Sequence, residues 1–381
     1  MIEKAERLQE VKEYYFSKKL REISDLKSAG KSIINIAIGN PDIPPAPEVI
    51  QAMNHTASIK NAHQYQSYQG IPALREAISN FYQKHYQVTI NPANEILPLM
   101  GSKEGIMHIS MAFLNKGDKV LVPNPGYPTY SSVSRLLQAE VINYNLTSQN
   151  NWFPDLEELS KQDLSRVKIM WVNYPHMPTG AIASENDFLR LISFCKKHQI
   201  LLVNDNPYSF ILNDRPSSIL SITGAKEVCL ELNSFSKTFN LPGWRVGMVL
   251  GKSEIIEAIL AVKSNMDSGM FLGIQHGAIA AMNLGDDWLN NLNSTYRERR
   301  KLVWEIFDKL GCTYDKEAKG LFVWAKIPSN QEAIAYTDKL LYEKNIYIAP
   351  GEVFGTNGKE YVRASLCTPE EKLKEVLNRL N

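Results

Sequence analysis

The sequence predicts an α/β protein with a three-layer large domain on a mainly parallel sheet and a smaller α+β domain. Short apolar strands alternate with amphipathic helices through most of the chain, the pattern of a parallel sheet covered by helices on both faces. The 381 residues exceed one ordinary domain core. The hydrophobic share of 44% and charged share of 22% are those of a globular protein with a sizeable core.

The predicted elements follow a regular order along the chain. Apolar residues spaced three to five apart predict one or two helices in residues 4–28, forming an N-terminal arm. Further helices are predicted by apolar stripes at 74–82, 185–198, 253–262, 331–344 and 369–380. Strands are predicted at 119–122, 167–173, 199–203, 228–232, 246–250, 321–327 and 361–367, and a short apolar run occupies 33–38.

Two features suggest domain boundaries. Clustered prolines after Gly39 favour an extended connector, and a long predicted helix begins near Trp288. We expect residues 1–40 to form the N-terminal arm and part of the small domain. Residues 41–285 are expected to form the large domain, and residues 286–381 the C-terminal small domain.

Charge and composition exclude several classes of function. The formal net charge is +1, so no nucleic-acid or anionic membrane partner is indicated. No apolar run approaches the ~20 residues of a membrane span, and the charged N-terminus does not resemble a signal peptide. The four cysteines form no C-x-x-C pair and resemble buried thiols of a reducing compartment, so we expect a cytoplasmic protein. No metal-ligand motif is present.

Residues 234–247, SFSKTFNLPGWRVG, place one lysine and one arginine among hydroxyls and glycines. A lysine that forms an imine with an aldehyde must lose its proton near neutral pH, and burial near cations disfavours the ammonium of Lys237. Ser234, Ser236 and the two-pronged guanidinium of Arg245 are donors suited to a phosphate dianion. A solvated lysine is the alternative for an isolated Ser-x-Ser-Lys, but the following Gly-x-Arg-x-Gly favours a site for a phosphorylated carbonyl cofactor.

This segment closely resembles the lysine motif of class I/II aminotransferases, the fold-type I family that includes aspartate aminotransferase. Matching motifs occur in the family's order from Gly39 to Arg363, so the resemblance spans nearly the whole chain. It implies a fold-type I transferase with pyridoxal 5′-phosphate as cofactor. It also implies a homodimer with active sites at the subunit interface.

The resemblance implies cofactor contacts for residues at the ends of predicted strands. Lys237 would bind the cofactor covalently, and Asp205 would pair with its protonated ring nitrogen. Tyr208 would hydrogen-bond the ring oxygen, and Tyr127 would stack on the ring. Taken alone, the Asp-Asn-Pro-Tyr segment is also a plain turn motif, and Tyr127 is also a turn-packing aromatic residue.

Ser102 and Lys103 begin a predicted helix after Gly101. The free N–H groups and the dipole at a helix start favour an anion, so a phosphate would fit there. Serine is also an ordinary N-cap, and the segment is not a Walker loop.

One position departs from the family pattern. The family carries Asn-Pro-Thr-Gly, and its asparagine donates to the cofactor's ring oxygen, whereas this chain has Met177 in that place. A thioether cannot donate a hydrogen bond. We therefore expect an effect on rate or reaction choice more than on cofactor binding. His176 either replaces the missing donor or packs against the sheet edge.

Three residues are implied in substrate binding and assembly. Arg363, in an Arg-x-Ser strand, matches the arginine that binds the substrate α-carboxylate, although strand alternation alone equally allows an outward-facing arginine. Gly39 matches a glycine that offers backbone to that carboxylate, or is only a turn glycine. Tyr65 matches a tyrosine that touches the partner subunit's cofactor phosphate, and aromatic turn packing is its alternative.

The implied activity is transfer of an amino group between an L-amino acid and a 2-oxo acid by a ping-pong mechanism. Two alternatives stay open. The protein is a lyase or decarboxylase on the same scaffold, or it is a homologue whose catalysis is impaired by Met177. Residues 265–271 lack the arginine that dicarboxylate-specific members often carry, and they resemble the branch that includes diaminopimelate aminotransferases. The amino donor itself cannot be read from the sequence.

Overall fold

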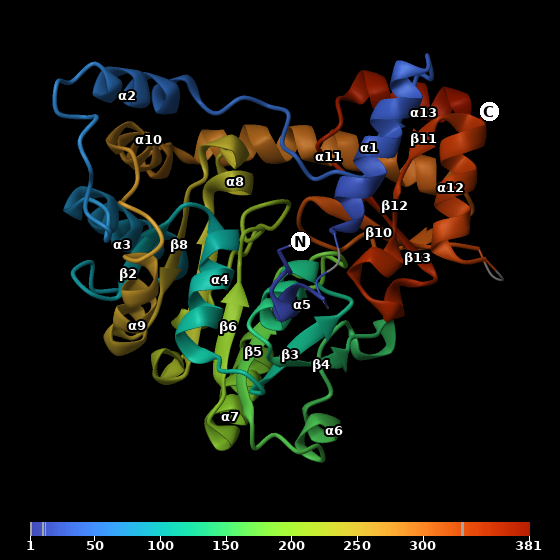
Figure 1. Ribbon diagram of the computed structural model, residues 1–381. Coiled ribbons are helices and arrows are strands. Elements are labelled where there is room, and N and C mark those ends of the chain that lie inside the picture. The colour runs from blue at the N-terminus through green and yellow to red at the C-terminus, as the bar shows by residue number, and fades with distance from the viewer. Residues whose placement is uncertain (1, 10, 12, 329–330) are drawn as a thin grey trace.

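The computed structural model describes residues 2–9, 11, 13–328 and 331–381 and contains one large and two smaller sheets (Figure 1). The strands of the large sheet, in spatial order, are β2 (Ile96–Leu99), β8 (Gly247–Leu250), β7 (Cys229–Ser234), β6 (Leu201–Asp205), β5 (Val167–Val172), β3 (Lys119–Asn124) and β4 (Glu140–Asn145). Neighbouring strands are parallel except at β8, which runs antiparallel to β2 and β7. The predicted mainly parallel sheet is confirmed.

Helices cover both faces of the large sheet. The main helices of the described chain are α1 (Tyr15–Ser28), α2 (Pro47–Ala57), α3 (Pro72–Tyr86), α4 (Ser102–Phe113), α5 (Pro128–Leu136), α6 (Leu156–Ser160), α7 (Glu185–His198), α8 (Phe235–Thr238), α9 (Ser253–Lys263), α10 (Leu272–Met282), α11 (Asp286–Lys309), α12 (Ala333–Lys344) and α13 (Glu370–Arg379). None of these described helices combines the length and apolarity that crossing a membrane requires.

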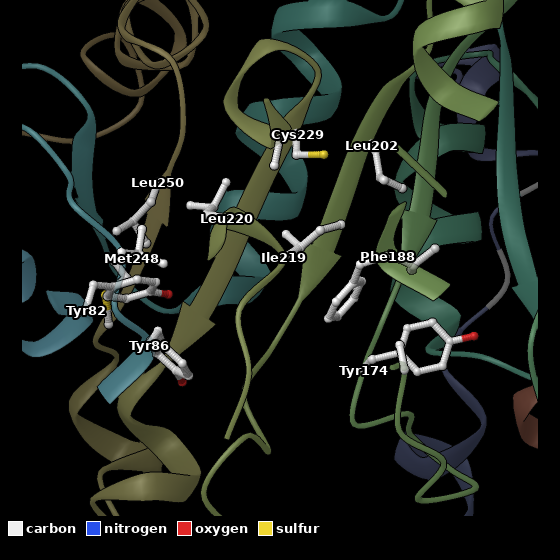
Figure 2. Close-up of a cluster of buried hydrophobic side chains, with 14 of the residues drawn as sticks. Tyr82, Tyr86, Tyr174, Phe188, Leu202, Ile219, Leu220, Cys229, Met248 and Leu250 are labelled. Atoms are coloured by element: carbon white, nitrogen blue, oxygen red, sulfur yellow. The ribbon is translucent and has the colours of Figure 1, made fainter. Parts of the chain in front are cut away.

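Side-chain alternation along the strands produces two cores, one on each sheet face. Met170 of β5 packs in a cluster with residues of α3, α7 and α10, whereas Trp171 packs in a second cluster with α4, α5 and α9. Figure 2 shows part of the first cluster, including Tyr82 of α3 and Met248 of β8. The large sheet and its two helical layers therefore form the expected three-layer arrangement.

The smaller sheets combine the two ends of the chain. Their strands are β1 (Ile34–Asn35) with β11 (Ile346–Tyr347), and β12 (Ala349–Pro350), β13 (Tyr361–Ser365), β10 (Phe322–Lys326) and β9 (Thr313–Tyr314). Parallel pairing of β1 with β11 joins the N-terminal segment to the C-terminal part. A third core contains Phe16 and Ile36 together with residues of α11 and α13. The long helix α11 runs from the large-sheet part toward this smaller part (Figure 1).

The topology brings several strand ends to one edge of the large sheet. Because β2 and β7 both run opposite to β8, the carboxyl ends of β2, β5, β6 and β7 lie on the same side. β6 ends at Asp205, β7 at Ser234, and α4 begins at Ser102 just after β2. In sheets of this kind, ligands bind at the carboxyl edge.

Candidate active site

A cavity of about 460 Å³ lies at this carboxyl edge and is also lined by residues of β10 and β13. The residues singled out in the sequence that line it are Gly39, Ser102, Lys103, Tyr127, Met177, Asp205, Tyr208, Ser234, Ser236, Lys237, Arg245 and Arg363. Tyr65 does not line this cavity, and its side chain is 90% exposed. Its contact with a partner subunit stays a prediction.

Lys237 lies in the single turn of α8 (Phe235–Thr238), which directly follows β7. The hydroxyl of Ser234 accepts a hydrogen bond from the backbone N–H of Ser236 at 3.2 Å and so caps this short helix. The Lys237 ammonium donates to the backbone carbonyl of Gly39. Burial lowers the pKa of Lys237, and the nearby guanidinium groups of Arg363 and Arg245 lower it further. The environment therefore makes the neutral, nucleophilic amine more accessible than it is for a lysine in water.

One end of the cavity is built of backbone N–H groups, hydroxyls and the guanidinium of Arg245. Gly101 has φ +91°, and a Cβ there would collide with that guanidinium. A Cβ on Gly247 would lie 2.6 Å from the backbone nitrogen of Ser102. These two glycines therefore allow the Arg245 guanidinium and β8 to lie directly against the start of α4. This combination of donors suits a phosphate.

Asp205 ends β6 in a buried position with one oxygen unpaired. The Tyr130 hydroxyl donates to its Oδ2 at 2.8 Å, whereas its Oδ1 has no hydrogen-bond partner among the described residues. Burial raises the pKa of Asp205 to about 7, and the Tyr130 hydrogen bond opposes that rise. The unpaired Oδ1 can accept a proton or a cationic N–H group from a ligand.

The role of Tyr130 was not predicted from the sequence. This residue lies three residues after Tyr127 on the first turn of α5, and its ring stacks on Trp171 with centroids 4.9 Å apart. The i,i+3 spacing on a helix places the two tyrosines on one face. That spacing was the only available signal, and it does not reveal that the hydroxyl reaches Asp205.

Arg363 is buried, with 5% of its surface exposed, and has no acidic partner among the described residues. Its guanidinium carbon lies 3.8 Å from the ring centroid of Phe322 and 4.4 Å from that of Phe354. One terminal nitrogen donates to the carbonyl of Ala37 at 2.9 Å, and Nε is unpaired. Burial lowers the pKa of Arg363 to about 10. The alternative of an outward-facing arginine is wrong, because this face of β13 is turned to the cavity.

Met177 contacts Arg363 directly. Its Sδ lies 3.2 Å from Nη1 of Arg363, and its backbone N–H donates to the side chain of Asn173 at 2.7 Å. His176 does not line the cavity: it is buried beside Thr179, 2.8 Å away, and burial lowers its pKa to about 3. The structure therefore does not support His176 as the replacement donor. It supports the alternative, in which His176 packs against the sheet edge.

The N-terminal helix α1 forms a wall of the cavity that the sequence analysis did not anticipate. Tyr14, Phe16, Ser17 and Leu20 line it. Buried Lys19 holds α1 on α12 through an ion pair of 2.8 Å with Asp338. The expected arm is therefore also part of the site.

A separate group of possible metal ligands lies behind the start of α4. Ligand atoms of Glu104, His108 and Asp267 all lie within 4.8 Å of one another. The ammonium of Lys263 is 2.8 Å from both carboxylate oxygens of Asp267. This group therefore already contains a protein cation.

The fold and this site define a pyridoxal-phosphate-dependent aminotransferase of fold-type I. The chain belongs to the family of class I and II aminotransferases, whose model matches residues 31–380. It is 38% identical to the LL-diaminopimelate aminotransferase of Desulforudis audaxviator, over 99% of this chain and 96% of that one. It is 37% identical to that of Dehalococcoides mccartyi, over 99% and 97%.

A solved structure supports the same assignment. Substrate-bound BacF from Bacillus subtilis superposes with a TM-score of 0.95 at 35% identity, covering 100% of this chain and 97% of that one. The expected family, fold and cofactor dependence are confirmed.

Proposed function

We propose that this aminotransferase binds pyridoxal 5′-phosphate covalently at Lys237 and uses that amine to move the proton at the substrate Cα. The supporting observation is that one cavity holds a lysine with a lowered pKa, a buried Asp205 oxygen with no hydrogen-bond partner and a buried arginine, Arg363, with no acidic partner, both absences holding among the described residues. When bound, the cofactor supplies an electron sink for the bond broken at Cα.

Arg363 orients the substrate. Its unpaired Nε and the adjacent Nη groups offer a bidentate site for an α-carboxylate, which would supply the missing negative charge. Gly39 lies beside it, and a Cβ at that position would collide with the Phe322 ring. Glycine therefore lets the Phe322 ring pack directly on the backbone at position 39, whose carbonyl accepts a hydrogen bond from Lys237. Fixing the carboxylate also fixes which Cα bond faces the reactive groups.

Three other side chains control protons. The neutral Lys237 amine accepts the Cα proton and later returns it, as general base and then general acid. Ionised Asp205, which Tyr130 stabilises by its hydrogen bond, holds the proton on the cofactor's ring nitrogen. Tyr208 serves as donor to the ring oxygen, because Met177 cannot donate.

The remaining residues hold and cover the cofactor. Ser234, Ser236 and Arg245, together with Ser102 and Lys103 at the start of α4, bind the phosphate. Tyr127 stacks on the ring.

We also propose an assembly and a location. Two copies form a homodimer in which Tyr65 contacts the other subunit's phosphate, a role that its exposed side chain allows. Residues 1–40 and 286–381 act as the small domain beside the large domain of residues 41–285. Four buried free thiols favour the reducing cytoplasm.

The proposed function can be tested by stopped-flow absorbance of the holoprotein mixed with single amino acids. We expect the cofactor spectrum to convert to its amine form, with one equivalent of 2-oxo acid released, and a second 2-oxo acid to reverse the change. LL-diaminopimelate, named in the relatives, is one of the donors to test. A Lys237→Ala variant that turns over like the unaltered protein would contradict the proposal.

A further inference from the structure

The part of the cavity nearest Arg363 is aromatic and apolar. Phe16 of α1 and Phe354 lie on this side, with ring centroids 6.1 Å apart, and Phe354 contacts the Arg363 guanidinium. Leu20 and Ile38 extend the same wall. If Arg363 binds the α-carboxylate, as proposed above, the substrate side chain must lie close to this wall.

The charged groups that line the cavity are Lys103, Asp205, Lys237, Arg245 and Arg363. Only Asp205 among them is acidic, and the proposed function assigns it to the ring nitrogen. A second ammonium group on a substrate would therefore find no acidic partner among the described lining residues. Burying an unpaired charge is strongly unfavourable. The far end of LL-diaminopimelate carries such an ammonium, together with a carboxylate.

A second carboxylate on the substrate would also lack a free partner among the described lining residues. The proposed function already assigns each lining cation of the described chain: Lys237 to the cofactor, Arg245 and Lys103 to its phosphate, and Arg363 to the α-carboxylate. The ammonium of Lys103 also lies 5.6 Å from the ring centroid of Tyr14, which is 36% exposed. The aromatic and apolar lining residues therefore suit a ring or an aliphatic chain better than a second ion.

We propose that the preferred amino donor is an L-amino acid with an uncharged aromatic or large apolar side chain, and that Phe16 of α1 is its main specificity residue. This inference rests on the proposed function. The wall is already in place without substrate, since Lys19 fixes α1 to α12 through Asp338. An aromatic substrate side chain gains binding free energy from stacked or edge-to-face contacts with such rings, in addition to the free energy gained by burying its apolar surface.

The first experiment compares donors on the holoenzyme. Single-turnover rates are measured with L-phenylalanine, L-leucine, L-alanine, L-aspartate, L-glutamate and LL-diaminopimelate. We expect kcat/KM for phenylalanine to exceed that for the three charged donors by on the order of 100-fold. A preference for a charged donor would overturn this inference and leave the proposed function intact. Failure of every amino acid to convert the cofactor would instead contradict the proposed function.

The second experiment tests Phe16 itself. Phe16→Ala should lower kcat/KM for phenylalanine by on the order of 100-fold, mainly through KM, and lower that for alanine much less. Phe16→Leu should recover most of the loss, because an apolar side chain refills the wall. Leu189→Ala, at an exposed position of α7 outside the cavity lining, is the matched control. Equal losses for phenylalanine and alanine would overturn the specificity role.

Circular dichroism and cofactor absorbance of each variant check that the protein folds and carries its cofactor.

Discussion

Arg245 and Arg363 lie at two ends of one cavity in opposite environments. Arg245 is exposed in the single chain, has a left-handed backbone with φ 56°, and donates to the carbonyl of Pro242 at 2.9 Å. Arg363 is buried between Phe322 and Phe354. Burial lowers the pKa of Arg363 to about 10.

The two environments suit two kinds of anion. A dianion such as phosphate can be shared among a hydrated arginine, hydroxyls and backbone N–H groups, so each contact contributes modestly. When one desolvated arginine binds a carboxylate, almost all of the binding free energy depends on that arginine. The site therefore distributes cofactor binding over many groups and concentrates substrate binding in one.

The largest effect is expected at the buried arginine. Arg363→Ala should lower kcat/KM for the amino donor by roughly 10²- to 10³-fold, because loss of a buried charge pair costs about 2–5 kcal/mol. Arg363→Lys should recover little, since an ammonium cannot form the bidentate contact. Steady-state kinetics measure both variants. A loss of less than about fivefold would show that substrate binding is not concentrated there.

A smaller effect is expected at the exposed arginine. Arg245→Ala should weaken pyridoxal phosphate binding by about 10- to 100-fold, because the other donors remain. Absorbance titration of the cofactor-free protein measures the Kd. Pyridoxal, which lacks the phosphate, is the control ligand and should bind both proteins equally. A matching loss for pyridoxal would contradict a phosphate contact.

Tyr130→Phe should shift the pH dependence of stability of the cofactor-free protein. Burial raises the pKa of Asp205 from 3.8 to about 7. The folded protein therefore retains a proton that the unfolded chain loses, and the free energy of unfolding falls as pH rises from about 4 to about 7. Losing the Tyr130 donor raises this pKa further, so the fall should extend about one pH unit higher.

Urea titrations across this pH range test that shift. Asp205→Asn is the control background, in which Tyr130→Phe should no longer alter the pH dependence. A shift that persists without the Asp205 carboxyl would assign the effect to another group.

The smallest effect is expected at Met177, which lines the cavity and contacts Arg363. Met177→Asn adds a donor that can stabilise the deprotonated ring oxygen. The visible absorbance of the bound cofactor should then change at a pH about one unit lower, with kcat/KM altered by less than about tenfold. Met177→Leu, which adds no donor, is the control. An equal shift in both variants would exclude hydrogen bonding as the cause.

Local patterns predicted much of the fold. The helix at 185–198 matches α7, and the strand at 167–173 matches β5 within one residue, because their hydrophobic periods are distinct. The antiparallel direction of β8 and the pairing of β1 with β11 were not predicted. Both depend on contacts between segments far apart in the chain, which a local pattern does not encode.

The site was predictable where residues form contiguous motifs. Motifs around Lys237 and Asp205 supplied residues that line one cavity. Tyr130 and Phe16 were missed, because their roles arise from the packing of α5 and α1. Strand alternation correctly placed the Arg363 side chain on the opposite face of β13 from Val362 and Ala364. Because both faces of β13 are buried, a side chain that points away from one core does not point into solvent.

The central claim is that Lys237 carries the cofactor. Borohydride reduction of the holoprotein followed by peptide mass spectrometry tests it directly, because reduction makes the lysine adduct permanent. We expect the phosphopyridoxyl group on the peptide containing Lys237. Its presence on a different lysine, or a protein that binds the cofactor without any reducible adduct, would contradict the account.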